Sequence, residues 1–219
     1  MESKKVGFVG CYSHDLILLL AGVLACFEKR VLLIDRNVNH TLAASFPVPE
    51  GLSVTREIVE YDRFLYTAGK AEEKTRPEAD VVLWDFGMAT HWEIASCDLL
   101  FLVSDVLPHH IHRLTDLHIH SDKVCNVILR EVFSKEILRE KEIAEFLSQY
   151  ERRTPILLYP DERDLRARMV CETRNDFRVE NASEQVREAV FRMFHELFPQ
   201  VSQKDFWKIV KRKERRWYS

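Results

Sequence analysis

The sequence VGFVGCYSHDLILLL, residues 6–20, joins two apolar segments through a short polar turn. Residues 6–9 are typical of a buried strand, Gly10 of a tight turn, and residues 15–27 of a helix that is apolar nearly all round. A strand, a glycine turn and a helix in this order form the layout of a phosphate-binding loop. The turn that follows Gly10, however, contains neither a second glycine nor a lysine. These residues predict an α/β fold and leave nucleotide binding open.

The rest of the chain continues the alternation of strand and helix. Short apolar segments rich in Val, Ile and Leu predict buried strands at residues 31–34, 81–84, 99–103, 124–129 and 156–159. Helical spacing of apolar residues predicts helices at 54–68, 108–120, 135–152 and 183–198, while 47–49 and 72–77 read as loops. We therefore expect an α/β domain with a doubly wound, mainly parallel sheet flanked by helices.

The composition indicates a soluble globular chain. Its 219 residues are 46% hydrophobic and 31% charged, and the formal net charge is -3, which excludes binding of polyanions by the molecule as a whole. Five dispersed cysteines without a C-x-x-C pair indicate a reducing compartment. With no signal-like segment at the start, we expect a cytoplasmic protein.

The C-terminal residues differ from the rest, so we expect an α/β domain at 1–203 and a basic, aromatic tail at 204–219. Helical spacing predicts that the tail has an apolar stripe surrounded by basic side chains, which suits a membrane surface or a partner. Two alternatives are packing of the apolar residues on the body, and contact with an acidic groove or nucleic acid. The expected contact residues are Phe206, Trp207, Lys208, Ile209, Val210, Lys211, Arg212, Lys213, Arg215, Arg216 and Trp217.

The order and spacing of these segments resemble P-loop NTPases of the MinD/ParA type over most of the chain. The similar segments are KVGFVG at 5–10, AGVLACFEKRVLLID at 21–35, VVLWDFG at 81–87, DLLFLVSD at 98–105, VCNVILR at 124–130 and PILLYP at 155–160. The resemblance implies a nucleotide site whose positions here are Gly10, Cys11, Ser13, His14, Asp15, Asp35, Asp85 and Gly87. In that family the residues matching Asp35 and Asp85 position the attacking water or act through magnesium.

The turn departs from the family pattern in ways that bear on its chemistry. Phosphate binding requires amides freed by glycines, a lysine on the β/γ phosphates and a hydroxyl on magnesium. The glycines and the lysine are missing, and Asp15 is expected to bring a carboxylate near where phosphates would lie. Without those groups, Asp35 and Asp85 are expected to have structural roles more than catalytic ones. We therefore expect no catalytic residue and no cofactor, with ATP and magnesium as the alternative.

Three other kinds of site are weaker alternatives. A dinucleotide fold would need glycines where Tyr12 and Asp15 stand. A zinc site could use histidines of residues 108–120, for which the candidates are His109, His112, His118 and His120 with Asp116. A nucleophilic dyad of Cys11 and His14 lacks an evident third group.

The expected function is that of a pseudo-ATPase, a scaffold or localisation factor that works through protein contacts. The resemblance extends to the divergent TadZ/CpaE group, which positions secretion or pilus machinery in bacterial cells. The alternatives are an ATPase with an atypical phosphate loop, and a regulatory module for a small ligand or dinucleotide. We expect a protein partner, including a homodimer, with peripheral membrane contact through the tail and no nucleic-acid binding. A dimer would need apolar or aromatic contacts around residues 11–14 and 91–92.

Overall fold

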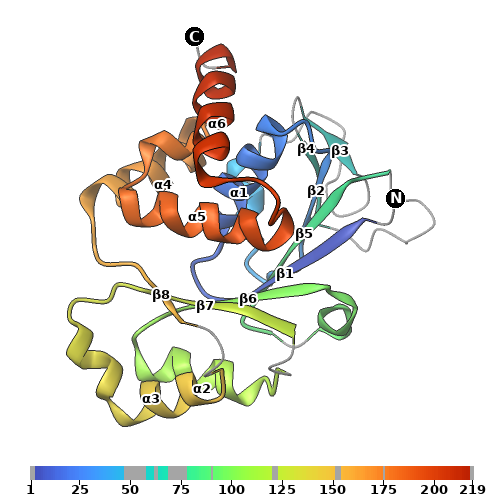
Figure 1. Cartoon of the computed structure of the whole chain (residues 1–219). Coiled ribbons are helices and arrows are strands. Elements are labelled where there is room, and N and C mark those ends of the chain that lie inside the picture. Colours follow the sequence, from blue (N-terminus) through green and yellow to red (C-terminus); the bar gives the residue numbers. More distant parts are fainter. Residues whose placement is uncertain are drawn as a thin grey trace.

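An eight-stranded sheet organises the chain in the computed structural model, which describes residues 3–46, 58–61, 64–68, 78–89, 91–119, 123–150, 154–174 and 176–217. The strand order is β3-β4-β2-β5-β1-β6-β7-β8 (Figure 1). Neighbouring strands are parallel except for the antiparallel pair β3 and β4. The strands are β1 (Lys4–Gly10), β2 (Val31–Asp35), β3 (Val59–Glu60), β4 (Phe64–Thr67), β5 (Val81–Gly87), β6 (Leu99–Asp105), β7 (Val124–Arg130) and β8 (Ile156–Leu157). The predicted doubly wound α/β fold is confirmed.

Helices cover both faces of the sheet, which explains why its central strands are apolar without alternation. The helices are α1 (His14–Cys26), α2 (Pro108–Asp116), α3 (Lys141–Ser148), α4 (Glu162–Arg174), α5 (Glu184–Leu197) and α6 (Gln203–Trp217). One core cluster joins the sheet to α1, α4, α5 and α6, and the other joins it to α2 and α3 (Figure 1). Consecutive residues of β1 point to opposite clusters, with Phe8 in the first and Val9 in the second.

The helix expected at residues 54–68 is wrong for the part that the structure describes, since that part contains β3 and β4. Phe64, Leu65 and Tyr66 are all buried and extend the sheet beyond β2. Burial on both faces hides the alternation that identifies a strand, so a helical reading fits equally well. The loops expected at 47–49 and 72–77 lie outside the described residues.

The C-terminal helix α6 packs on the body along its apolar stripe. The Phe206 and Val210 side chains are fully buried, and the Phe206 ring lies 5.9, 5.0 and 4.9 Å from the rings of Phe27, Phe191 and Phe194. These contacts place the stripe against α1 and α5. Within the described residues, the chain has no helix that combines the length and the apolar character needed to span a bilayer.

Polar contacts add to the docking of α6. The Lys213 Nζ lies 2.8 Å from a Glu28 carboxylate oxygen beyond the end of α1. Glu214 is buried and accepts a hydrogen bond of 2.8 Å from the Val179 amide. Burial raises the pKa of this carboxyl to about 7, so its charged form is disfavoured in the folded chain. The helix is therefore held by its apolar stripe, an ion pair and a buried hydrogen bond.

Candidate functional site

The carboxyl ends of β1, β2, β5 and β6 open onto a cavity of about 530 Å³. Its lining comes from the turns that follow those strands and from α2. In open α/β sheets, ligands bind beyond the carboxyl ends of the strands, so this cavity is the candidate site. The lining residues are Gly10, Cys11, Tyr12, Ser13, His14, Asn37, Val38, Asn39, Thr41, Met88, Ala89, His110 and Arg113.

The turn after β1 is held tightly against β6. Gly10 has a φ of +132°, and a Cβ atom at this position would lie 1.7 Å from the Val103 carbonyl oxygen. The next amide, that of Cys11, donates a hydrogen bond of 2.9 Å to the same carbonyl. Only glycine permits this approach and this backbone conformation. The glycine therefore fixes the turn to the neighbouring strand.

Asp15 does not face the cavity, which corrects the expectation that it meets a phosphate. Its buried carboxylate pairs with both terminal nitrogens of Arg130, at 2.5 and 2.8 Å, and lies 3.5 Å from the Arg168 Nε. Burial opposes ionisation, but the Arg130 charge and hydrogen bonds outweigh it and hold the pKa of Asp15 well below its usual range. The Arg130 guanidinium also donates a hydrogen bond of 2.6 Å to the Tyr12 carbonyl. Arg130 thus clamps the turn from inside the protein.

Asp85, at the end of β5, is surrounded by hydrogen-bond donors. Its buried carboxylate accepts bonds from the Ser13 hydroxyl at 3.2 Å, the Thr41 hydroxyl at 3.2 Å and the Gly87 amide at 3.0 Å. The side-chain amide nitrogen of Asn37 lies 3.5 Å from the Asp85 carboxylate. Burial raises the pKa of this carboxyl despite these donors. Asp85 therefore links three turns of the carboxyl edge.

Asp35, at the end of β2, orders the loop that follows its own strand. Its carboxylate accepts hydrogen bonds from the Asn37 amide at 3.0 Å and the Leu42 amide at 3.2 Å, and the Tyr66 hydroxyl lies 3.4 Å away. Burial, and then the charge of Asp85, raise the pKa of Asp35 to about 6. Both aspartates thus have structural partners within the fold.

The expected dyad of Cys11 and His14 does not form. The Nε2 of His14 lies 2.8 Å from a Glu172 carboxylate oxygen on α4, whereas the Cys11 Sγ lies 3.8 Å from the Nδ1 of His110. The histidine beside the cysteine therefore comes from α2.

The histidines proposed as zinc candidates do not gather. His109, His112 and His118 are exposed, and within the described residues none of them belongs to a group with metal-ligand spacing. His120 lies outside the described residues. Such a group is instead formed by Cys11, Asp105 and His110, whose ligand atoms all lie within 4.8 Å of one another.

Sequence reasoning missed Asp105, His110 and Arg130 as members of the site. Asp105 and Arg130 are the last residues of β6 and β7. Strand β6 lies next to β1, and β7 lies next to β6. A polar residue at the carboxyl end of a strand adjoining the first turn is the signal that could have identified both. The position of His110 on α2 depends on where that helix packs, which the sequence does not give.

Large apolar side chains stand exposed along the same edge of the sheet. Tyr12, Val38, Trp92, Leu107 and Phe133 follow β1, β2, β5, β6 and β7 within two to five residues, and their exposed fractions are 47, 78, 79, 47 and 77%. These strands are parallel, so their carboxyl ends share one edge. The edge therefore combines the cavity with a set of exposed apolar side chains, the apolar rim.

The tail residues divide between buried and exposed positions. Phe206 and Val210 are buried and Trp207 and Ile209 are partly buried, so the predicted anchors face the body. This placement agrees with the alternative in which the apolar residues of the tail pack on the body, since Phe206 and Val210 enter the core beside α1 and α5. The basic residues Lys208, Lys211 and Arg212 remain exposed, and Lys213 pairs with Glu28. The side chains of Arg215, Arg216 and Trp217 lie outside the described part of the chain.

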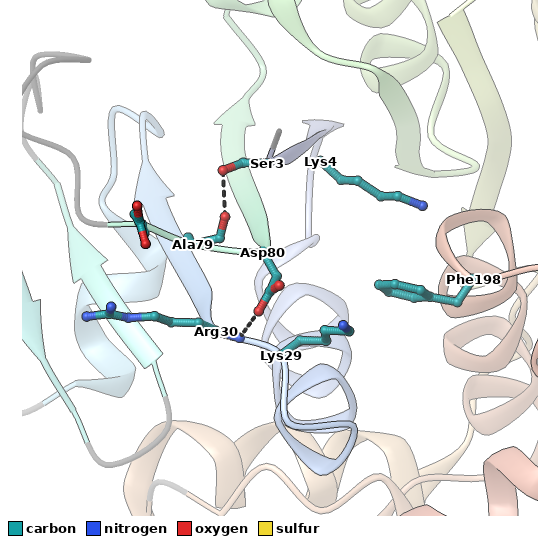
Figure 2. Close-up of a pocket in the computed structure, with 8 residues that line it drawn as sticks. Ser3, Lys4, Lys29, Arg30, Ala79, Asp80 and Phe198 are labelled. Carbon is teal, nitrogen blue, oxygen red and sulfur yellow. Dashed lines mark hydrogen bonds between the residues drawn. The ribbon is translucent and has the colours of Figure 1, made fainter. Parts of the chain in front are cut away.

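A second cavity, of about 380 Å³, lies at the amino ends of β1, β2 and β5 (Figure 2). Lys4 and Lys29 lie over the Phe198 ring, at 4.8 and 5.6 Å from its centre, and the Asp80 carboxylate accepts a hydrogen bond of 2.8 Å from the Arg30 amide. Several polar residues that line this cavity are thus engaged in contacts within the protein. The cavity also lies at the amino ends of the strands, opposite to the edge where α/β sheets bind ligands.

Comparison with known protein families finds no matching family model, and no curated protein matches the sequence. Solved structures do match. The MinD cell division protein of Aquifex aeolicus is similar with a TM-score of 0.60 and 14% identity, over 91% of this chain and 98% of that one. A chain of the MinC:MinD cell division protein complex of the same organism gives 0.59 and 12%, over 88% and 96%.

A putative plasmid partition protein of Borrelia burgdorferi, solved with bound AMPPNP, has a TM-score of 0.56 and 10% identity, over 91% of this chain and 100% of that one. At such identities the likeness is one of fold, and it extends over nearly the whole of each chain. The chain has the MinD/ParA-like fold.

Proposed function

We propose that this chain is a catalytically inactive, MinD/ParA-like pseudo-ATPase that acts as a scaffold or localisation factor through protein contacts. The observation that carries the proposal is the engagement of the turn after β1 within the protein. Its first amide is bonded to β6, its Ser13 hydroxyl to Asp85 and its Tyr12 carbonyl to Arg130. Of these, the Cys11 amide is a donor of the kind that a phosphate loop needs to leave open for its ligand.

The residues of the cavity do not fit a bound triphosphate. Among the described residues that line it, Arg113 is the one permanent cation, and its side chain lies exposed on α2. No lysine is present between Gly10 and Asp15 to reach the β and γ phosphates. The carboxylates of Asp35 and Asp85 accept hydrogen bonds from the turns around them, so neither is free to hold a metal or to activate water.

The apolar rim supports the second half of the proposal, contact with another protein. Exposed aromatic side chains at the centre of a surface are the residues that contribute most to protein interfaces. Tyr12, Trp92 and Phe133 provide three of them on one edge, each 47% or more exposed. We propose a second copy of this chain as the first partner, because the apolar rim can meet itself across a two-fold axis.

The exposed basic face of α6 supports a weaker contact with an acidic surface. Lys208, Lys211 and Arg212 point away from the body, while the apolar stripe of the helix is buried. A cytoplasmic membrane surface could attract these charges at about 1 kcal/mol for each residue. In this arrangement the contact is electrostatic and peripheral, with no insertion of Phe206 or Val210.

Calorimetric titration with ATP, ADP and NAD, with and without magnesium, tests the inactive site. We expect no saturable heat up to about 1 mM nucleotide, because the turn after β1 has neither the lysine nor the further glycines of a phosphate loop. Micromolar binding of ATP that depends on magnesium, with turnover lost in Asp85→Asn, would contradict the proposal. The Asp85→Asn variant is tested for native unfolding behaviour first, since Asp85 also holds the turns together.

An ATPase with an atypical loop is the second candidate, and one contact favours it. The Ser13 hydroxyl lies 3.2 Å from Asp85, and a hydroxyl and an aspartate in these places hold magnesium in P-loop enzymes. The same titration decides between the two. Binding of NAD without ATP would instead favour the regulatory small-ligand module.

The Trp92→Glu variant tests the protein contact. We expect the wild-type chain to dimerise in solution and this substitution to weaken the dimer by about 2 kcal/mol or more, roughly 30-fold, because a central tryptophan is lost. Sedimentation equilibrium measures the dissociation constant, and Trp92→Phe is the matched control that keeps an aromatic ring. A wild-type chain that stays monomeric would exclude the homodimer, and equal dissociation constants would exclude this edge.

A further inference from the structure

Three potential metal ligands from separate segments meet beside the cavity. Cys11 lies in the turn after β1, Asp105 ends β6, and His110 is in the first turn of α2. The His110 Nδ1 lies 3.8 Å from the Cys11 Sγ and 2.8 and 2.9 Å from the two carboxylate oxygens of Asp105. Within the described residues this is the one group of three or more such side chains with metal-ligand spacing. We propose that Cys11, Asp105 and His110 form a zinc-binding site.

The chemistry of the three ligands selects the metal. A thiolate, an imidazole and a carboxylate together suit Zn²⁺, whereas magnesium and calcium prefer oxygen ligands alone. The thiolate and the carboxylate carry two negative charges, which balance the charge of the ion. Three protein ligands with an open fourth position are characteristic of zinc sites that also bind water or an exogenous ligand.

The sulfur–nitrogen distance is close to that of a tetrahedral zinc site. With Zn–S near 2.3 Å and Zn–N near 2.1 Å, tetrahedral geometry separates sulfur from nitrogen by about 3.6 Å, against the 3.8 Å found here. Nitrogen and carboxylate oxygen should lie about 3.4 Å apart, so the His110 and Asp105 atoms must separate by roughly half an ångström. The His110 side chain is partly exposed and can make this adjustment by rotating.

Neighbouring groups orient the proposed ligands. The Leu107 amide donates a hydrogen bond of 3.0 Å to Asp105 Oδ1, which fixes the carboxylate with both of its oxygens within 2.9 Å of the His110 Nδ1. The Ser104 hydroxyl lies 3.9 Å from the Cys11 sulfur. Hydrogen bonds of this kind to metal ligands hold them in place before the ion binds.

The fourth position faces the cavity, since Cys11 and His110 both line it. An ion held there would be reached from the crevice by water or by a small anionic ligand. Binding replaces the proton that His110 Nδ1 shares with Asp105 by the metal, moves that proton to Nε2, and releases the thiol proton of Cys11. The site does not depend on the proposed loss of ATP hydrolysis.

Cobalt substitution tests the site without any enzymatic activity. We expect one equivalent of Co²⁺ to give the near-ultraviolet charge-transfer band of a cobalt–thiolate bond, and Zn²⁺ to abolish it by displacement. Cys11→Ser should remove the band, and Asp105→Asn and His110→Ala should each weaken Zn²⁺ binding at least about tenfold, measured by competition with a chromophoric chelator. His112→Ala is the matched control, because this exposed histidine of α2 lies outside the group.

Alkylation provides a second measurement that is independent of those variants. In the wild-type chain, Zn²⁺ should slow the reaction of Cys11 with iodoacetamide at least about tenfold, as read by mass spectrometry of the peptide, because the thiolate is bound to the metal. Absence of the charge-transfer band, an unchanged alkylation rate, or loss of binding in His112→Ala to the same extent as in His110→Ala would each overturn the proposal.

Discussion

Replacing Arg130 with methionine is expected to lower the free energy of unfolding by about 3 to 5 kcal/mol. The substitution leaves the buried carboxylate of Asp15 without the guanidinium that binds both of its oxygens, and it removes the hydrogen bond to the Tyr12 carbonyl. Arg168 lies 3.5 Å from Asp15 and offsets a part of the loss. Denaturant unfolding at pH 7 measures the difference, with the slope of the transition as a check on two-state behaviour.

The pH dependence of this loss in the free energy of unfolding shows whether it arises from an unpaired buried charge on Asp15 or only from lost packing of the Arg130 side chain. The low pKa of Asp15 in the folded wild type means that its ionised form stabilises the fold above about pH 4, and that this contribution disappears on acidification. Without Arg130, burial raises that pKa, so the variant loses stability as the pH rises from 4. The difference between the two proteins should therefore be smaller at pH 4 than at pH 7.

The double variant Asp15→Asn with Arg130→Met is the matched control. It should recover part of the stability lost in Arg130→Met, because no charge is left buried without a partner. A loss below about 1 kcal/mol in the single variant, or the same loss at both pH values, would show that the clamp contributes little.

Replacing Phe206 with alanine is expected to cost about 3 to 5 kcal/mol in the free energy of unfolding. The ring is fully buried and packs on three other phenylalanines of the first core cluster. Removing it leaves a cavity between α6, α1 and α5 that the surrounding aromatic rings can fill only in part. Thermal or denaturant unfolding followed by circular dichroism measures the effect.

Lys208→Ala is the control for Phe206, since it shortens an exposed side chain on the same helix. It should change the stability by less than about 0.5 kcal/mol. If Phe206→Ala were equally mild, the helix would be only loosely attached, and its aromatic residues would again be available to a membrane or a partner.

The positions of the central strands could be predicted from the sequence because the sheet is buried on both faces. Strands such as β5 and β6 are covered on both faces, and this burial requires continuous apolar runs that stand out between polar segments. The helix expected at 183–198 is α5, and the Ser183 hydroxyl caps its start by accepting a hydrogen bond from the Val186 amide. Apolar runs and helix caps depend on residues close together in the chain, so a single sequence is enough to predict them.

The site was harder to predict because its partners are distant in the chain. The sequence suggests that the Asp15 carboxylate lies beside a phosphate. In the structure that carboxylate is paired with Arg130, which is 115 positions away in the chain. His110 reaches Cys11 across 99 positions. Periodicity says which face of a helix is buried, but it does not say which side chain of another element stands opposite. The cavity, the clamp and the apolar rim all depend on such pairings.

The central position of β1 has a consequence for synthesis. This strand is made before its two neighbours in the sheet, β5 and β6, which begin at residues 81 and 99. Asp15, five residues after this strand, forms its ion pairs with Arg130 and Arg168, which are made later still. The apolar residues of β1 and α1 must therefore wait, with their hydrophobic surface accessible to chaperones, until these later segments have been made.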